Sequence, residues 1–211
     1  MYNHKIITSH KTIVNKCGVV ILAAGSSTRM GRPKQLLKYN GDSLLKQIVK
    51  KALDSNADPV IVILGANADL IGKEIENENI TIVINHEWKQ GMASSMIKGL
   101  KALLRTAPSA DCVIFMMCDQ PFISVSLLKD LIAMQQATTK PIVASNYGNT
   151  IGPPALFCKS TFPEISELKG DIGARGIIQQ HANEVATVYF PAGSIDIDTA
   201  EDYESLLKNL K

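Results

Sequence analysis

The sequence lacks several features that would place the protein in a broad functional class. No apolar stretch approaches the ~20 residues that cross a bilayer, and residues 1–16 lack the apolar block of a signal peptide. The chain has 22 basic and 20 acidic residues and a formal net charge of +2, which is too balanced for a nucleic-acid or membrane-binding surface. We therefore expect no nucleic acid or membrane as a partner, and we expect a local cluster of donors to hold any anionic ligand.

Cysteine motifs are also absent. The four cysteines form no C-x-x-C pair and have no nearby pair of histidines, so the sequence shows no zinc or thiol–disulfide motif. Three of the four stand in or beside apolar runs, where cysteine packs as a small buried hydrophobe. We expect structural thiols in a reducing compartment, the cytoplasm.

Short apolar runs alternate with amphipathic stretches over most of the chain. Apolar residues at helical spacing predict helices over 43–54, 96–104 and 127–132. The short runs predict strands buried on both faces, at Val19–Ala23, Val60–Leu64, Ile80–Ile84, Val113–Met117 and Ile142–Ala144. This alternation predicts an α/β fold, a single three-layer α/β/α Rossmann-like domain with a mostly parallel sheet over residues 17–211, after an N-terminal extension of residues 1–16.

The pattern changes after residue 145. Residues 146–154 are rich in turn formers, and Gly170–His181 is typical of a loop followed by a helix. Ala155–Cys158 and Glu184–Phe190 are candidate strands. A last helix is predicted from about Thr199, with an apolar stripe of Tyr203, Leu206, Leu207 and Leu210.

A glycine-rich segment, Leu22 to Lys34, follows the first predicted strand at the edge where open α/β sheets bind ligands. Gly25 and Gly31 can adopt positive φ and leave room for a ligand against the backbone. Arg29 offers a planar fork suited to phosphate, and Lys34 a compact point charge. Backbone N–H groups and side-chain hydroxyls are expected to complete the contacts to phosphates. The residues that supply them are Leu22, Ala23, Ala24, Gly25, Ser26, Ser27 and Gly31.

Two common phosphate-binding motifs are excluded in this segment. The nucleotide P-loop needs lysine directly after its second glycine, whereas Arg32 follows Gly31. The dinucleotide fingerprint G-x-G-x-x-G fails because two serines follow Gly25. An ordinary basic surface loop is the alternative, but it explains less well why glycines, hydroxyls and cations stand together directly after a buried strand.

These residues match a known family. The stretch L-A-A-G-S-S-T-R-M-G-R-P-K resembles the signature of the molybdenum cofactor nucleotidyltransferases. It is most similar to the cytidylyltransferase branch, since the guanylyltransferase branch usually has glycine in place of Ala24. The resemblance covers about residues 17–208. It implies a fold of the nucleotide-diphospho-sugar transferase (glycosyltransferase-A) type, a Mg²⁺-dependent nucleotidyltransferase, CTP as its nucleoside triphosphate, and catalytic roles for Arg29 and Lys34 on the triphosphate.

One carboxylate, Asp119, stands at the exit of the predicted strand 113–117. A lone aspartate there is commonly a turn former or a helix cap. Asp119 should nevertheless emerge at the same sheet edge as the glycine-rich segment, and Mg²⁺ is typically held by one or two carboxylates plus substrate phosphates. Cys118-Asp119-Gln120-Pro121 also resembles the family segment whose aspartate binds magnesium, which implies a catalytic, metal-binding Asp119.

A second acidic cluster lies near the C-terminal end. Asp196-Ile-Asp-Thr-Ala-Glu-Asp202 resembles the family's D-I-D-T-P-E-D segment and implies a second metal contact from Asp198 or Asp196. A purely structural interpretation is also open, because Asp198 and Glu201 have the spacing of a capping box at the start of the last helix.

Further nucleotide contacts are implied by the resemblance. The stretch from Trp88 to Met96 is similar to the family's W-x-x-G-M-x-x-S segment near the base and ribose. It implies contacts from Gly91, Ser94 and Ser95, although serines are equally typical of a first helical turn. Gly65, at the end of the second predicted strand, is expected near the base.

The acceptor side is implied by two segments. Leu168–Arg175 resembles the family's L-x-G-D-x-G-A-R, which implies contacts from Asp171 and Arg175; the alternative is a loop that caps a helix. Gly152 belongs to the same side, where the sequence reads Gly-Pro-Pro instead of the family's usual G-H-P. This difference falls in the region expected to recognise the acceptor.

The predicted reaction transfers CMP from CTP to the phosphate of a molybdopterin-type cofactor and releases pyrophosphate. A phosphate monoester is already anionic, so positioning and charge neutralisation replace a strong general base. The alternatives are the same chemistry on a sugar or polyol phosphate, a non-catalytic nucleotide-binding or cofactor-chaperone protein, and a nicotinamide oxidoreductase, which the missing dinucleotide fingerprint disfavours. A molybdopterin acceptor also implies a molybdoenzyme client as a partner.

Overall fold

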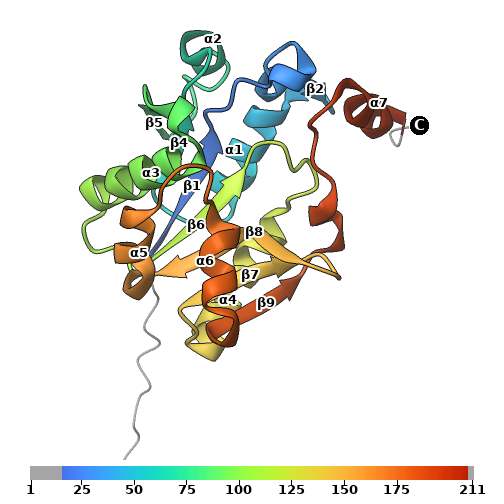
Figure 1. The fold of residues 1–211 in the computed structure, drawn as a ribbon. Helices are drawn as coiled ribbons and strands as arrows, with labels where there is room; N and C mark the ends of the chain where they lie inside the picture. Colours follow the sequence, from blue (N-terminus) through green and yellow to red (C-terminus); the bar gives the residue numbers. More distant parts are fainter. Residues whose placement is uncertain (1–15, 209–211) are drawn as a thin grey trace, which may run out of the picture.

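A central β-sheet organises residues 16–208, which are the residues that the computed structural model describes; residues 1–15 of the predicted extension lie outside them. Seven strands form this sheet (Figure 1), in the spatial order β5 (Thr81–Ile84), β4 (Val60–Leu64), β1 (Cys17–Ala23), β6 (Cys112–Met117), β8 (Ile151–Cys158), β7 (Ile142–Asn146) and β9 (Val185–Tyr189). Only β8 runs antiparallel to its neighbours within this sheet. The predicted α/β fold with a mostly parallel sheet is confirmed.

Helices cover both faces of the sheet (Figure 1). The helices on these faces are α1 (Leu44–Asp54), α2 (Ala68–Gly72), α3 (Met92–Thr106), α4 (Val125–Thr138), α5 (Phe162–Glu167) and α6 (Ala174–Gln180). The last helix, α7 (Ala200–Lys208), lies apart from the sheet, and β2 (Lys38–Tyr39) and β3 (Asp42–Ser43) form a small hairpin. Alternate residues of a strand point to opposite faces, so Val19 and Ile21 of β1 pack in the core under α1 and α4, whereas Val20 and Leu22 pack in the core under α3, α5 and α6. The three-layer α/β/α architecture follows from this alternation.

The first difference between the predicted and the observed strands concerns β5. The sequence predicts a strand over residues 80–84 that is buried on both faces, but β5 lies at the edge of the sheet and, among the described strands, pairs with β4 alone. Its first three residues are half-buried, and Ile84 is 41% exposed. Hydrophobic composition therefore predicted the strand correctly and its full burial wrongly.

The second difference concerns β8, which begins at Ile151 instead of residue 155. Its register against β7 passes from the pair Ala144–Ala155 to the pair Ser145–Gly152, so Pro153 and Pro154 fall at an irregularity between regular pairs. Proline is tolerated at such bulges because its missing N–H breaks no ladder hydrogen bond. The sequence predicts a turn at these two adjacent prolines, whereas in the structure the strand runs through them.

The last helix begins with a different cap from the predicted one. Thr199 Oγ1 accepts a hydrogen bond from Asp202 N (3.2 Å), and the Asp202 carboxylate accepts one from Thr199 N (2.8 Å). The capping box is thus Thr199–Asp202, and the proposed pair Asp198–Glu201 is wrong. The Asp198 carboxylate is free to face another part of the molecule.

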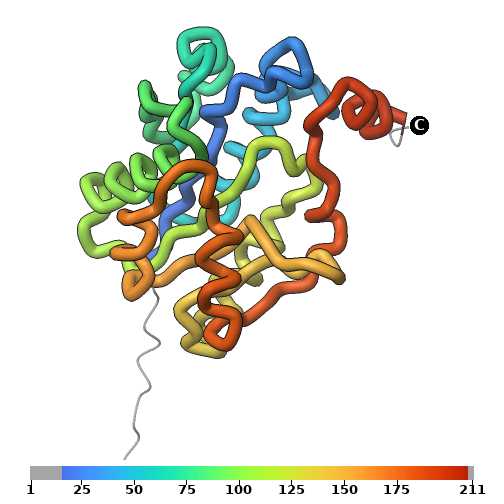
Figure 2. Tube along the Cα trace, viewed as in Figure 1, coloured from blue at the N-terminus to red at the C-terminus, as the bar shows by residue number. Residues whose placement is uncertain are grey.

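The C-terminal segment packs against the glycine-rich segment, although the two are far apart in the sequence (Figure 2). A small apolar cluster joins the two and consists of Met30, Leu37, Leu44, Ile197 and Leu206. Of the predicted apolar stripe of α7, Leu206 is buried, Tyr203 packs against the cluster, Leu207 is 37% exposed, and Leu210 lies outside the described residues. The cluster holds the segment that carries Asp198 beside the loop after β1.

Parallel pairing brings the candidate residues to one edge of the sheet. β1 lies between β4 and β6, with Ala23 beside Leu64 and Leu22 beside Met117. The loops that leave these three strands therefore start at the same edge, the usual ligand-binding edge of an open α/β sheet. Ala66 N donates to Ala24 O and joins the loops after β4 and β1, whereas Ile197 N donates to Asp119 O and joins the segment before α7 to the loop after β6 (both 3.0 Å).

Candidate active site

The glycine-rich loop turns twice after β1. Gly31 has φ of +66° and Ser27 has φ of +56°, on either side of a short 3-10 helix. Gly31 thus uses the positive φ that glycine permits, whereas Gly25 does not, and Ser27 is the other left-handed residue of the loop. A side chain at Gly25 would meet no atom within 4 Å, so this part of the loop leaves space in front of the backbone.

Gln35 fixes the shape of the loop from within. Its amide Nε2 donates to the carbonyls of Ala23 (3.0 Å) and Gly25 (2.9 Å), and its side chain is buried. Ser27 Oγ donates to Gln35 Oε1 and accepts from Lys34 N. The Ser27 hydroxyl thus stabilises the loop, although it was predicted to contact the nucleotide. The sequence analysis did not identify Gln35, because a single glutamine before two leucines belongs to no recognisable motif.

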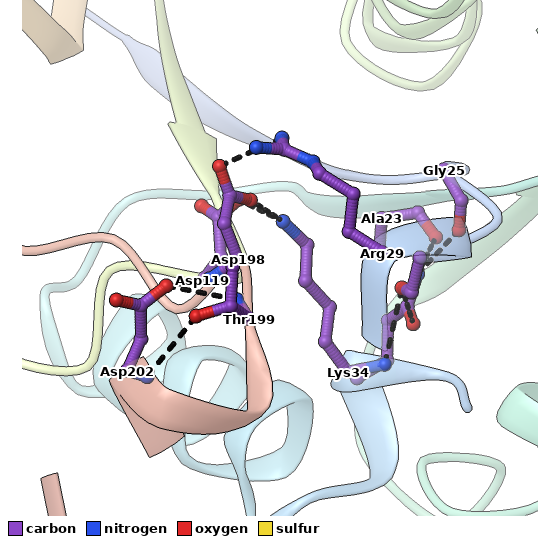
Figure 3. Close-up of polar contacts among 10 residues, drawn as sticks. Ala23, Gly25, Arg29, Lys34, Asp119, Asp198, Thr199 and Asp202 are labelled. Carbon is purple, nitrogen blue, oxygen red and sulfur yellow. Dashed lines mark hydrogen bonds and ion pairs between the residues drawn. The ribbon is translucent and has the colours of Figure 1, made fainter. Parts of the chain in front are cut away.

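Four charged side chains meet in front of this loop (Figure 3). Lys34 Nζ donates to Asp119 Oδ2 (2.5 Å) and to Asp198 Oδ1 (2.9 Å), and Arg29 Nη2 donates to Asp198 Oδ2 (2.9 Å). The cations predicted to bind phosphates and two of the carboxylates predicted to bind metal therefore lie together. In this structure the two cations and the two carboxylates neutralise one another.

The cluster sets the ionisation of its members. Burial alone would lower the pKa of the Lys34 ammonium, but the Asp119 carboxylate and the hydrogen bonds to Asp119 and Asp198 outweigh it and raise that pKa. The hydrogen bond from Lys34 lowers the pKa of Asp198. Burial, together with the nearby carboxylates of Asp119 and Asp198, raises the pKa of Asp196 to about 6. Lys34 and Asp198 are therefore charged near neutral pH.

The carboxylates fit a metal ion that also takes oxygen atoms from a substrate. Among residues 16–208, no group of three or more histidine, cysteine, aspartate or glutamate side chains is arranged to hold a metal by protein ligands alone. Asp119 and Asp198 both contact Lys34 Nζ, so both can face one cation. Hard carboxylate oxygens in this number suit Mg²⁺, which usually keeps several non-protein ligands. Asp196 lines a neighbouring pocket.

A first pocket of about 240 Å³ opens between the glycine-rich loop and the start of α3. Predicted residues form much of its lining: Leu22, Ala23, Ala24, Gly25, Lys34, Gly91, Ser95, Asp119 and Asp171. The remaining lining residues were not predicted as contacts, and they are Gln35, Trp88, Met92, Met117 and Cys118. The loop and the carboxylate thus border one cavity, which the indole of Trp88 and the thioethers of Met92 and Met117 also line.

Two predicted glycines permit close approaches between segments. A side chain at Gly65 would lie 2.7 Å from Ala24 O and 2.8 Å from Trp88 Cβ. One at Gly91, which has φ of +98°, would lie 2.3 Å from Gly170 O. Gly91 therefore allows the loop that carries Asp171 to sit against the start of α3.

The serines at the start of α3 are anchored by a residue that sequence reasoning missed. Asn85 Nδ2 donates to Ser94 Oγ (2.8 Å) and Ser95 Oγ (3.0 Å), and Ser94 Oγ donates to Gly91 O. Asn85 is fully buried and has no apparent motif around it. Ser94 belongs to this structural network, whereas Ser95 also borders the first pocket.

A second pocket, also of about 240 Å³, adjoins the first and shares Asp119 and Asp171 with it. Arg175 and Asp196 line it, and the Arg175 guanidinium forms no hydrogen bond or salt bridge with any residue in the range 16–208. Gly152 stands beside it, since a side chain there would lie 3.4 Å from Arg175 Nη2. The structure brings together the three residues predicted for the acceptor. It adds Gln120, Tyr147 and an apolar floor that includes Phe115.

A family model supplies the identity of this arrangement. The model for the MobA-like NTP transferase domain matches residues 19–185. The chain belongs to this family. As a MobA-like protein it has a nucleotidyltransferase fold, with the glycine-rich loop, Asp119 and Arg175 inside the match and Asp196 and Asp198 beyond its end.

Several characterised relatives share most of the chain. Nicotine blue oxidoreductase of Paenarthrobacter nicotinovorans is 31% identical over 199 residues, which cover 89% of this chain and 95% of the relative. Purine catabolism protein PucB of Bacillus subtilis (strain 168) is 29% identical over 195 residues, covering 88% and 93%. The solved structure of Rv0371C in complex with manganese, from Mycobacterium tuberculosis H37Rv, has a TM-score of 0.76 at 27% identity and covers 92% of this chain and 99% of that chain.

Proposed function

We propose that this MobA-like protein is a Mg²⁺-dependent cytidylyltransferase that transfers CMP from CTP to the phosphate of a molybdopterin-type cofactor and releases pyrophosphate. The observation that carries the proposal is the pair of adjoining pockets with Asp119 on their common wall. One pocket borders the cationic loop, and the other contains Arg175, whose guanidinium has no hydrogen-bond or ion-pair partner among residues 16–208. Two substrates of an in-line transfer need this arrangement, because their reacting atoms must meet at one point.

The charged cluster supplies the transition-state stabilisation. Asp119 and Asp198 would hold Mg²⁺, whose chemistry is to neutralise the charge of the triphosphate. Lys34 and Arg29 then exchange their carboxylate partners for phosphate oxygens. An oxygen of the acceptor phosphate attacks the α-phosphorus, the bond from that phosphorus to the bridging oxygen breaks, and pyrophosphate leaves with the bonding electrons. Positioned charge is the main catalytic resource in phosphoryl-group chemistry of this kind.

The residues of each pocket have separate roles in this proposal. Ala23, Ala24, Gly25 and neighbouring amides line the nucleotide side, Arg175 lines the acceptor side, and Asp171 borders both pockets. The choice of CTP rests on the likeness of the loop to the cytidylyltransferase branch, including Ala24. A relative solved with manganese supports a divalent metal. An acceptor of molybdopterin type also implies delivery of the product to a molybdoenzyme.

The proposal places the activity in the cytoplasm. All four cysteines are free, and Cys17, Cys112 and Cys118 are buried, as expected of structural thiols in a reducing compartment. No helix between residues 16 and 208 is long and apolar enough to cross a membrane.

An oxidoreductase is the second candidate, favoured by the name of the relative from Paenarthrobacter nicotinovorans. The first βα loop carries two serines after Gly25, which do not fit a dinucleotide fingerprint. Titration with NADH, followed by its fluorescence, distinguishes the candidates: saturable binding would favour the oxidoreductase and contradict our proposal.

The decisive experiment is a matrix of four ribonucleoside triphosphates against candidate phosphates, with Mg²⁺ and with pyrophosphate release as the readout. We expect release with CTP and a molybdopterin-type phosphate. Release with a sugar or polyol phosphate instead would keep the chemistry and change the acceptor. Mg²⁺-dependent CTP binding without release on any acceptor would contradict the enzymatic proposal and support a nucleotide-binding or chaperone role.

A further inference from the structure

A hydrogen-bonded chain forms one wall of the second pocket. Gln120 follows Asp119 directly, and its side chain is 3% exposed. Its Nε2 donates to Gly193 O (2.9 Å) and to Tyr147 Oη (3.1 Å), and the Tyr147 hydroxyl in turn donates to Pro153 O. The N–H groups of Gln120 and the O–H group of Tyr147 therefore already have acceptors within the protein.

The orientation of the Gln120 amide is determined by its neighbours. A backbone carbonyl such as Gly193 O can only accept a hydrogen bond, so the amide nitrogen must face it. Rotating the amide by half a turn would place two acceptor oxygens against each other. The Gln120 carbonyl is thus held in one position, on the side away from Gly193.

This carbonyl has no partner. Among the buried side-chain nitrogen and oxygen atoms of residues 16–208, Gln120 Oε1 alone lacks a hydrogen bond. A buried acceptor without a donor costs about 1–3 kcal/mol, and native proteins rarely leave one. Because Gln120 lines the second pocket, a ligand in that pocket can supply the missing donor.

The rest of the pocket agrees with a ligand that donates hydrogen bonds. Its other polar groups include the carboxylates of Asp171 and Asp196, which accept when ionised, and a single cation, Arg175. The Tyr147 proton is already given to Pro153 O. A ring with N–H or O–H groups and an anionic substituent for Arg175 matches this set.

We propose that Gln120 Oε1 accepts a hydrogen bond from a ring N–H or O–H of the acceptor molecule and makes the pocket selective for rings that carry such a donor. The inference rests on the proposed function, since it takes the second pocket as the acceptor site. A ring that offers no donor leaves Oε1 unpaired, and a net hydrogen bond of about 1.4 kcal/mol corresponds to tenfold in affinity.

Two fluorescent probes test this without nucleotide or turnover. Pterin carries ring and amino N–H donors, whereas 1,3-dimethyllumazine has a similar ring and no N–H group. Fluorescence titrations of wild type should show pterin binding about tenfold more tightly or better. Gln120→Met removes the carbonyl at similar length and should reduce the ratio of the two affinities by about tenfold. Gln136→Met, at an exposed position on α4, should leave it unchanged.

Two further variants separate the carbonyl from the chain that holds it. Tyr147→Phe removes one partner of Nε2 and leaves Oε1 in place through Gly193, so it should keep the preference for pterin. Gln120→Asn retains an amide but withdraws its oxygen by one methylene, so it should lose the preference even if Gln120→Met does not fold.

An unchanged affinity ratio in a folded Gln120 variant would overturn the inference, and so would equal or absent binding of both probes by wild type. Failure of the proposed function is read separately, as absence of pyrophosphate release from any nucleoside triphosphate. Titration of Gln120→Met with CTP and Mg²⁺ serves as a control, because Gln120 does not line the first pocket, and CTP affinity should be retained.

Discussion

Lys34 is the residue on which most of the site's electrostatics depend. Its ammonium is largely buried and contacts two carboxylates from distant parts of the chain, Asp119 after β6 and Asp198 before α7. A cation in this position can bind phosphates only by giving up those contacts. The exchange is favourable when a metal ion takes the carboxylates, so loop and metal act together.

Removing that cation gives the first prediction. We expect Lys34→Ala to lower kcat for pyrophosphate release by about 10²-fold or more, the scale of losing one preorganised charge. Steady-state kinetics measure this, with Lys101→Ala on the exposed side of α3 as the matched control. Turnover of Lys34→Ala close to that of Lys101→Ala would contradict the role of Lys34.

Gly91 gives a prediction about backbone geometry. Gly91→Ala combines positive φ with a side chain 2.3 Å from Gly170 O, whereas Gly41→Ala has positive φ of +90° and open space around it. Strain alone costs about 1–3 kcal/mol, so the excess loss in Gly91→Ala reports the clash. Urea unfolding measures both variants, and equal losses would show that the loop of Asp171 does not press on α3 as described.

At the scale of elements, the C-terminal segment acts as a support for the site. Ile197 and Leu206 pack with Met30, Leu37 and Leu44, and this cluster fixes the backbone on which Asp198 stands. Apolar contacts thus position the backbone beneath Asp198, and the exposed ion pair from Arg29 to Asp198 adds little.

Adjacent leucines on α7 test this support. Leu206 is 3% exposed and Leu207 is 37% exposed. Leu206→Ala should destabilise the fold by about 2–5 kcal/mol, whereas Leu207→Ala should change stability by roughly 0.5 kcal/mol or less. Urea denaturation distinguishes them, and a similar loss in both variants would mean that the cluster does not secure α7.

His181 joins α5 to the end of α6 and predicts a pH dependence. Its Nδ1 lies 2.7 Å from Glu184 Oε2 and its Nε2 lies 2.8 Å from Glu164 Oε2. The hydrogen bond with Glu184, then that with Glu164, raises the pKa of His181 above its ordinary value of 6.5. The folded state therefore binds the proton more tightly than the unfolded state.

The sign of the effect follows from that difference. The contribution of His181 is complete below pH 6.5 and is lost as the pH rises through the higher folded pKa. Thermal melts of wild type and His181→Asn over this range should therefore converge as the pH rises. A constant difference between the two proteins would show that these glutamates do not stabilise the protonated imidazole.

For the whole molecule, the two pockets predict how ligands change stability. A ligand that binds only the folded state stabilises it by about 2.7 kcal/mol at a concentration one hundred times its Kd. CTP with Mg²⁺ should raise Tm, and removal of the metal by EDTA should abolish most of the rise. GTP at the same concentration should give a smaller shift, and equal shifts for both nucleotides would contradict the proposed selectivity.

The sequence predicted those parts of the site that depend on local patterns and on parallel pairing. Buried runs gave β1, β4 and β6, and strands paired in parallel must end at one edge, so Gly31, Lys34 and Asp119 could be placed together in advance. Residues fixed by contacts between distant segments were missed. Gln35, Asn85 and Tyr147 have no motif of their own, and their roles exist only through partners elsewhere in the chain.

Local sequence was therefore sufficient for the class of fold and for the basic and acidic character of the segments at one edge of the sheet, because periodicity and residue type act over a few neighbours. Long-range packing settled the antiparallel course of β8, the Thr199–Asp202 cap, the pairing of Lys34 with Asp198 and the unpaired carbonyl of Gln120. These features depend on which segments come together in space, and hydrogen bonds and ion pairs form or fail over a few ångströms.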